Sequence, residues 1–292
     1  MARVVVVHGV GQEFLGPELM CHQVGPALRD GIRLAGEVDP DAEVACAFYG
    51  DLFFPPGVRS WHLPPWDEHD VDGLEADLLD SWWAGAVAVD PDIADPAGTR
   101  GAAGFAVSRA LSSRAVRARL DALSGSRFFA AVSDRLLIFA LKQVRRYLTE
   151  RPLREAVRAR VAAAIDPDTR VLVGHSLGSV VAYETLCADP SLPVTDLVTL
   201  GSPLGLRSVV FDRLDPAPIG EVGLWPGTVR RWTNIADQGD VVALPGRLAD
   251  RFPDVQDETI ANGVRMHDLL RYLTAPTTGR AIARGVRNGD ES

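Results

Sequence analysis

A short apolar run followed by a glycine-flanked serine places the strongest constraint on how this chain can fold. Residues 171–173 read Val-Leu-Val and lead directly into Gly174-His175-Ser176-Leu177-Gly178. The apolar run is typical of a buried strand, and the small residues after it favour a helix. Ser176 would then lie in a sharp strand-to-helix turn, where neighbouring side chains would collide, so glycine is needed on either side. A glycine-rich turn with an incidental serine is the alternative.

Strands and helices are expected to alternate on both sides of this turn. Residues 3–7 form a β-branched run, residues 17–34 favour a helix, and residues 43–49 favour a second strand. Later strands are expected at 170–173, 195–200, 229–235 and 255–260, with helices at 177–186 and from 267. This alternation predicts an α/β fold, with a mostly parallel sheet covered by helices on both faces.

The alternation is interrupted between the second strand and the serine turn. Prolines stand at positions 55, 56, 64 and 65, and each removes a backbone donor and restricts the preceding residue. Four of the six tryptophans lie in or just after this proline-rich stretch, at Trp61, Trp66, Trp82 and Trp83. Helices are then expected near 105–123 and 128–164, so this part of the chain is interpreted as an insertion.

The charge of the chain argues against a nucleic-acid partner. Asp and Glu number 39 against 30 Lys and Arg, a net charge of −9, whereas nucleic-acid binding is led by a basic surface. Residues 60–99 hold ten acidic and no basic side chains, and residues 100–160 hold fourteen basic and four acidic ones. We expect the acidic block to pack over the basic helices within one molecule.

Cysteine usage and hydropathy bear on the location of the protein. The three cysteines, Cys21, Cys46 and Cys187, are odd in number and lack a metal-ligand spacing, which favours a reducing compartment. No window approaches the roughly 18 uncharged apolar residues of a membrane span, and residues 4–7 are too few for a signal-peptide core. We therefore expect a cytoplasmic protein without an integral membrane segment.

The serine turn resembles the nucleophile elbow of the α/β-hydrolase family, specifically its lipase-like and esterase-like serine hydrolases. The resemblance covers about residues 3–50 and 165–275. It implies that Ser176 is the nucleophile and that an acid and then a histidine follow along the chain. His267 is the single histidine after Ser176, so it is the expected general base. A surface histidine is the alternative.

The acid is expected after the strand at 229–235. Asp240, which is followed by two valines, resembles the family's acid position, and Asp237 resembles a helper aspartate three residues earlier. The carboxylate must hold the imidazole tautomer and stabilise the imidazolium that forms when His267 takes the proton of Ser176. Either aspartate would serve if it reached His267, and we favour Asp240.

The resemblance also implies an oxyanion hole with two backbone donors. One is the amide of Leu177, and the other is the amide of Val10 or Gly9, because His8-Gly9-Val10-Gly11 resembles the family's histidine-glycine loop. A tight glycine turn without this role is the alternative. Phe14 stands where a dinucleotide fingerprint would need its third glycine, and we expect neither a metal nor another cofactor.

Insertions in this family commonly form a lid. We expect residues 1–51 and 128–292 to form the α/β core and residues 52–127 the lid. The tryptophans of the insertion, Trp61, Trp66, Trp82 and Trp83, are the expected substrate-binding residues for a hydrophobic acyl group. The alternative is that these side chains form a small core of the lid itself.

These features predict a serine hydrolase that cleaves a carboxylic ester or thioester through a Ser176 acyl-enzyme, with a small-molecule or acyl substrate as its partner. An acyltransferase or cyclase would use the same triad, and a peptidase is a further alternative. A non-catalytic scaffold on the same fold would be expected to lack a triad member, and the sequence supplies all three.

Overall fold

The core is a parallel sheet. In a computed structural model of the 292-residue chain, the described residues are 3–37, 43–54, 64–90, 92–93, 111–128, 132–244, 246–263 and 265–290. Within them, six strands pair in parallel in the order β2-β1-β3-β4-β5-β6. Their bounds are β1 Arg3–Val7, β2 Glu43–Ala47, β3 Thr169–His175, β4 Asp196–Leu200, β5 Arg231–Asp237 and β6 Gln256–Ile260. The predicted α/β class and parallel sheet are confirmed.

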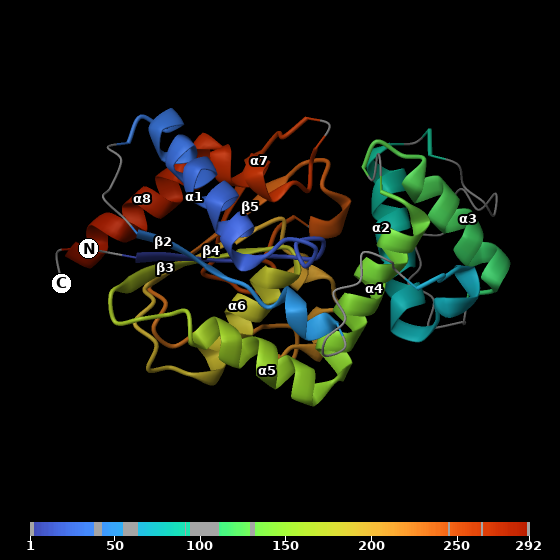
Figure 1. Cartoon of the computed structure of the whole chain (residues 1–292), viewed down its shortest axis with the longest axis horizontal. Helices are drawn as coiled ribbons and strands as arrows, with labels where there is room; N and C mark the ends of the chain where they lie inside the picture. Colours follow the sequence, from blue (N-terminus) through green and yellow to red (C-terminus); the bar gives the residue numbers. More distant parts are fainter. Residues whose placement is uncertain are drawn as a thin grey trace.

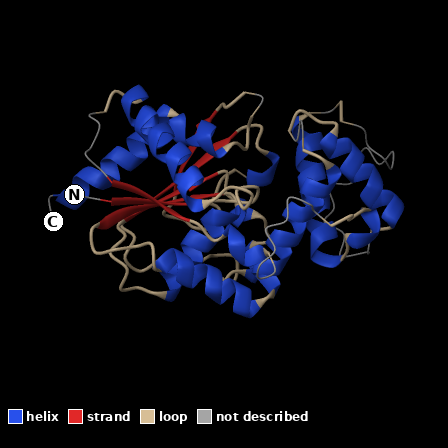
Figure 2. Ribbon diagram, viewed as in Figure 1, coloured by secondary structure: helices blue, strands red, loops and turns tan. Residues whose placement is uncertain are grey.

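Helices cover both faces of the sheet, as Figures 1 and 2 show. One face carries α1 (Pro17–Leu34), α7 (Leu269–Thr274) and α8 (Pro276–Asp290), and the other carries α5 (Arg151–Ala162) and α6 (Leu177–Ala188). Side chains of a strand alternate between faces, so Val4 and Val6 enter one hydrophobic core and Val5 and Val7 the other. Across the described ranges, no helix has both the length and the apolar character needed to cross a membrane.

The helix expected at 128–164 is divided into two. The structure has α4 at Asp134–Thr149 and α5 at Arg151–Ala162, with Glu150 outside both. Pro152 lies in the first turn of α5, the part of a helix in which a missing N–H costs nothing. A proline deeper inside one long helix would remove a hydrogen bond, so the chain begins a new helix instead.

A group of three helices lies at one end of the molecule (Figure 1), where α2 (Gly73–Val89), α3 (Ser113–Ser124) and α4 pack on one another. The sequence analysis did not predict α2. Gly85 of α2 packs against the segment after Asp240, since a Cβ at Gly85 would lie 2.9 Å from Leu244 Cδ1 and 3.4 Å from the carbonyl oxygen of Val241. This helical group therefore contacts the chain just beyond the expected catalytic acid.

Ion pairs between the acidic block and the basic helices hold the group together. Glu75 of α2, whose side chain is 2% exposed, pairs with Lys142 Nζ at 3.0 Å and Arg145 Nε at 2.7 Å on α4. Asp80 pairs with Arg119 of α3 at 2.6 Å. The expected packing of the two charge blocks is confirmed for the described residues. Removing both Lys142 and Arg145 would leave the buried Glu75 carboxylate uncompensated, which costs about 3–5 kcal/mol.

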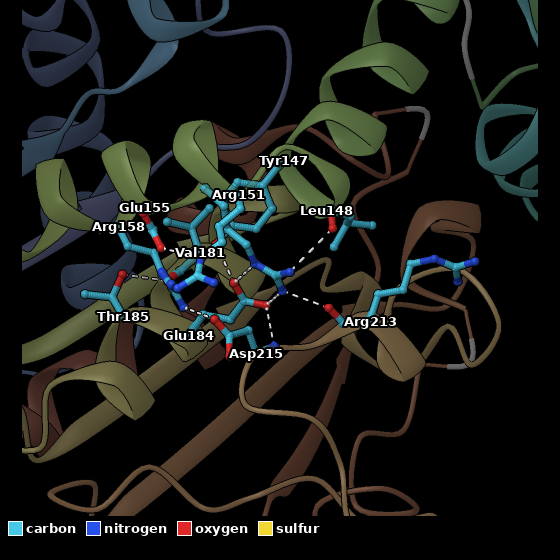
Figure 3. Close-up of polar contacts among 11 residues, drawn as sticks. Tyr147, Leu148, Arg151, Glu155, Arg158, Val181, Glu184, Thr185, Arg213 and Asp215 are labelled. Atoms are coloured by element: carbon cyan, nitrogen blue, oxygen red, sulfur yellow. Dashed lines mark hydrogen bonds and ion pairs between the residues drawn. The ribbon is translucent and has the colours of Figure 1, made fainter.

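A second buried carboxylate fastens α5 to α6. Glu184 accepts hydrogen bonds from Arg154 Nε at 2.7 Å, the Tyr147 hydroxyl at 2.7 Å and the N–H of Asp215 at 3.1 Å. Figure 3 shows Tyr147 and Asp215 beside Glu184. A cavity of about 340 Å³ opens beside it, lined by Leu148, Thr149, Arg151, Arg154, Arg158 and Asp215. Each of the three arginines lining it is paired with a carboxylate, respectively of Glu155, Glu184 and Asp215. The cluster therefore serves the packing of the helices.

Candidate active site

Ser176 occupies the turn between β3 and α6 that the sequence predicted. Its φ of 53° and ψ of −129° lie outside the ordinary regions, and it is the non-glycine residue with positive φ in the described part of the chain. Its N–H donates to the carbonyl of Leu200 at 3.0 Å. Gly178 packs on the carbonyl oxygens of Val7 and His8, where a Cβ would not fit. The predicted turn and the need for a glycine at 178 are confirmed, and the strained backbone is typical of functional serines.

Two further serines support this turn. The hydroxyl of Ser179 hydrogen-bonds the carbonyl of Ser176 at 2.6 Å and the hydroxyl of Ser202 at 2.7 Å. Ser202 follows β4, so these bonds join the ends of two neighbouring strands. Ser176 also precedes the first residue of α6, so the positive end of the helix dipole lies at its position.

Asp240 and His267 are brought together from separate segments. Asp240 Oδ2 lies 2.7 Å from His267 Nδ1, and Asp240 Oδ1 accepts the N–H of Val242 at 3.0 Å. Gly201, with φ of 54°, leaves room for this pair: a Cβ there would lie 2.8 Å from the Asp240 oxygen and 3.1 Å from His267 Nδ1. The carboxylate can only accept, so Nδ1 carries the proton and Nε2 is left as the basic nitrogen.

Asp237 has a different role in the structure. Its carboxylate accepts the N–H of Gly239 at 2.7 Å and the N–H of Asn262. These bonds hold the turn after β5 against the segment after β6. Between the two aspartates considered from the sequence, Asp240 is the one whose carboxylate contacts the imidazole.

Tyr272 is a member of this network that the sequence analysis missed. Its hydroxyl bonds Asp240 Oδ2 at 2.7 Å and accepts the N–H of Asp237 at 2.8 Å. The side chain is fully buried on α7. In the sequence, Tyr272 is marked only by its position five residues after His267. That spacing does not predict that its hydroxyl points toward Asp240.

His175 lies beside the imidazole of His267. The two rings are 4.8 Å apart between centroids, and the Tyr272 ring is 5.7 Å from His175. Burial, together with the neighbouring His267, holds the pKa of His175 well below its usual range. His175 is therefore neutral at pH 7 and packs against His267 as an aromatic side chain. Because it directly precedes Ser176, this contact places the serine turn and the His267 segment next to each other.

The loop after β1 touches the serine turn. A Cβ on Gly9 would lie 2.5 Å from the Cβ of Ser176, so the approach requires glycine. His8 holds the loop from behind, with Nδ1 2.7 Å from the carbonyl of Gly9 and Nε2 accepting the N–H of Tyr49 at 3.1 Å. Burial lowers the pKa of His8 to about 4. Val10, half-buried, follows Gly9, and Leu177 begins α6 directly after Ser176. An oxyanion hole formed by these amides stays a prediction.

The tryptophans of the insertion lie in different surroundings. Trp66 is half-buried and stacks on Phe139 of α4, with ring centroids 5.9 Å apart. Trp82 is buried in α2 as part of the hydrophobic core, and half-buried Trp83 lies under the guanidinium of Arg119 at 4.7 Å. Trp61 falls outside the described residues. Substrate contact by these side chains stays a prediction.

The residues of the candidate triad share one edge of the sheet. Ser176 follows β3 and Asp240 follows β5, with β4 between them, and parallel strands end on the same edge. Among the described residues, no group of three or more His, Cys, Asp or Glu side chains is arranged to hold a metal ion. The groups present are a serine hydroxyl, an oriented imidazole and a buried carboxylate, which can activate an oxygen nucleophile.

Comparisons with protein-family models, with curated protein sequences and with solved structures gave no match to this chain. Its function must therefore be inferred from its own residues and their geometry.

Proposed function

We propose that this protein is a serine hydrolase of the α/β-hydrolase type that cleaves a carboxylic ester or thioester through an acyl-enzyme on Ser176. One observation carries the proposal. The imidazole of His267 is oriented by a 2.7 Å hydrogen bond to buried Asp240, on the sheet edge where Ser176 stands in a strained strand-to-helix turn. A scaffold without catalysis would have no need to maintain either feature.

In the proposed reaction, Nε2 of His267 takes the proton of Ser176 Oγ while Oγ attacks the carbonyl carbon. Asp240 holds the proton on Nδ1 and stabilises the imidazolium that results. The amide of Leu177 and that of Val10 or Gly9 donate to the developing oxyanion. Collapse of the tetrahedral intermediate expels the alcohol or thiol, which receives the proton from His267. In deacylation, His267 takes a proton from water as the water oxygen attacks the acyl carbon, and returns it to Ser176 Oγ as the bond to the acyl group breaks and the carboxylic acid leaves.

The acyl group is proposed to be hydrophobic because aromatic rings gather beside the loop that follows β1. Phe14 lies 5.5 Å from Phe139 and 6.0 Å from Phe54, between ring centroids, and Trp66 stacks on the same Phe139. We propose that these rings line the acyl site and that the insertion of residues 52–127, which carries α2 and α3, acts as a lid over it. Apolar walls with a few placed polar groups are typical of small-molecule sites.

A cavity on the other side of the loop offers space for the rest of the substrate. It has a volume of about 230 Å³ and opens between the loop after β1, α1 and the start of α7. Its polar lining residues include Gln12, Gln23 and Asp268, and Asp268 directly follows His267. We propose that the alcohol or thiol portion lies there.

The test is covalent labelling with a fluorophosphonate probe, followed by turnover of p-nitrophenyl esters of increasing chain length. Ser176→Ala should abolish both labelling and turnover while the circular dichroism spectrum stays unchanged. Ser191→Ala is the matched control, because Ser191 is exposed and bonds only locally to Asp189. Labelling that persists in Ser176→Ala would place the nucleophile elsewhere and contradict the proposal. Labelling without hydrolysis, but with transfer to an added alcohol, would favour an acyltransferase.

A further inference from the structure

Glu13 is a carboxylate buried beside the loop that follows β1. It is 6% exposed, and its Oε2 accepts the N–H of Gly11 at 2.8 Å. Its other oxygen, Oε1, is buried and has no hydrogen-bond partner among the described residues. The sequence analysis gave this residue no role, although it lies four positions after Gly9. A buried carboxylate with one satisfied oxygen requires an explanation.

Among the described residues, the groups around Glu13 provide no positive charge. From its own loop it meets backbone amides, from α4 the side chain of Gln143, and from the segment after β2 it meets Tyr49 and Gly50. Burial and the nearby Glu13 raise the pKa of Tyr49 well above its usual range, and His8 beyond it has a pKa of about 4, so both are neutral at pH 7. Burial raises the pKa of Glu13 itself to about 7.

The backbone around Glu13 is closely packed. A Cβ on Gly50 would lie 2.6 Å from the Cα of Glu13 and 2.7 Å from its Cβ. Gly50 therefore packs directly on Glu13, an approach that a side chain at position 50 would prevent. Burying a carboxylate without a cation is unfavourable for folding, and a fold that needed only packing here would be better served by an apolar side chain. The N–H of Gly11 donates to this carboxylate at 2.8 Å and ties it to the loop that contacts Ser176.

We propose that Glu13 is a positioning residue that fixes the loop of residues 9–11 in the shape that directs its amides at the oxyanion. The loop touches Ser176 through Gly9 and is held at its far end by the bond from Gly11 to Glu13. Gly11 has a φ of 91°, so the carboxylate stabilises a backbone shape that few residues adopt. This inference rests on the proposed hydrolase function.

The ionised carboxylate makes a stronger hydrogen bond to the Gly11 amide than the protonated form. Acidification should therefore loosen the loop and slow the reaction. His267 must also be neutral to act as a base, so in the wild type two deprotonations should control the acid limb of kcat/KM. The slope of log kcat/KM against pH should then exceed 1 in the range where both groups are being protonated. With a glutamine at this position the carboxylate ionisation is absent, and the slope should be 1.

The first experiment measures the hydrogen bond between Gly11 and Glu13 directly and does not depend on catalytic activity. In protein labelled with ¹⁵N-glycine, the amide proton of Gly11, assigned by its loss in Gly11→Ala, should titrate with a midpoint near 7 in the wild type. It should not titrate near that pH in Glu13→Gln. Glu18→Gln is the matched control, because Glu18 is exposed on α1 and should leave the Gly11 titration unchanged. A Gly11 amide whose shift does not depend on Glu13 would overturn the proposal.

The second experiment measures turnover of a p-nitrophenyl ester from pH 5 to 9. Glu13→Ala removes the acceptor and should lower kcat by about tenfold to a hundredfold with KM little changed, as expected for misplaced oxyanion donors. Glu13→Gln keeps an acceptor oxygen but no charge, so its kcat at pH 8 should fall between those of the wild type and Glu13→Ala. It also keeps the proposal testable if the alanine variant does not fold. Unchanged kcat in folded Glu13→Ala, or a slope above 1 that persists in Glu13→Gln, would overturn it.

The two proposals fail in different ways. If Ser176 of the wild type is neither labelled nor needed for turnover, the hydrolase function is wrong and this role for Glu13 is wrong with it. If labelling is normal and the Glu13 variants behave like the wild type, the role of Glu13 alone is wrong.

Discussion

The hydroxyl of Tyr272 lies 2.7 Å from Oδ2 of Asp240, the same oxygen that contacts His267. Tyr272 receives the N–H of Asp237, so its own proton is directed at Asp240. With the amide of Val242 on Oδ1, the Asp240 carboxylate accepts from three different donors. A carboxylate bonded in this way has a fixed plane, and that plane in turn sets the orientation of the imidazole.

The first prediction separates the two aspartates. Asp240→Asn should lower kcat by several orders of magnitude, about 10⁴ in the best-studied triad, because an amide can hold the imidazole in the wrong tautomer. Asp237→Asn should be much milder, since the Asp237 carboxylate bonds backbone amides. Steady-state kinetics of the two variants check this. A larger loss of kcat in Asp237→Asn would reverse the assignment.

Tyr272→Phe tests whether the hydroxyl orients the acid. The change removes one donor to a charged oxygen, a bond worth about 1.5–3 kcal/mol, and leaves the Asp237 amide without its acceptor. We expect a lower melting temperature and a decrease in kcat of about tenfold, with KM nearly unchanged. Tyr183→Phe is the control, because the Tyr183 hydroxyl bonds the carbonyl of Leu224 at 2.9 Å away from the site. Equal losses of kcat in the two variants would indicate a general effect on stability.

Two tryptophan variants should separate substrate contact from core packing. Trp82 is buried in α2, so Trp82→Ala should lower the free energy of unfolding by about 3–5 kcal/mol. Trp66→Ala should instead raise KM for long-chain esters and spare short ones, because each methylene in an apolar pocket is worth about 1–3 kcal/mol. Chemical denaturation and a chain-length series measure the two effects. A chain-length preference unchanged in Trp66→Ala would remove the basis for a hydrophobic acyl site at this position.

The ionisation of Glu13 should appear in the pH dependence of stability. Its pKa is about 7 in the folded protein against an ordinary value of 4.5, so between these pH values the folded state binds more protons than the unfolded state. Stability is therefore lost as the pH rises through this window. Glu13→Gln should exceed the wild type in free energy of unfolding by up to about 3 kcal/mol at pH 8 and by little at pH 4.5. Urea titrations at both pH values check this, and a destabilised glutamine variant at pH 8 would contradict it.

Local patterns in the sequence predicted most of the sheet. The apolar runs at β1 and β3 are buried on both faces, and α1 occupies the expected residues 17–34. The helix α2 was not predicted, because the prolines that precede it at positions 64 and 65 indicate irregular backbone. Residues 73–89 contain leucine, alanine and glutamate, which are good helix formers. The helix propensity of these residues favours a helix at 73–89.

The candidate site was partly predictable for a related reason. Ser176 and the glycines around it form a local motif, and the residues of such a motif predict the backbone conformation of the turn itself. The choice between Asp240 and Asp237 depended on which carboxylate points toward a segment that follows β6. Two residues three positions apart differ in direction through the turn after β5, and that turn is set by bonds to Gly239 and Asn262.

By itself the sequence determined the parallel α/β framework, the strand-to-helix turn at Ser176 and the single histidine that follows it, because each depends on neighbours along the chain. Only the tertiary structure decided that Asp240 meets His267, that Tyr272 donates to the same oxygen and that Glu13 binds the loop beside Ser176. These contacts join segments brought together by packing, and their direction is fixed by burial and by hydrogen bonds between separate segments, which no local pattern of residues encodes.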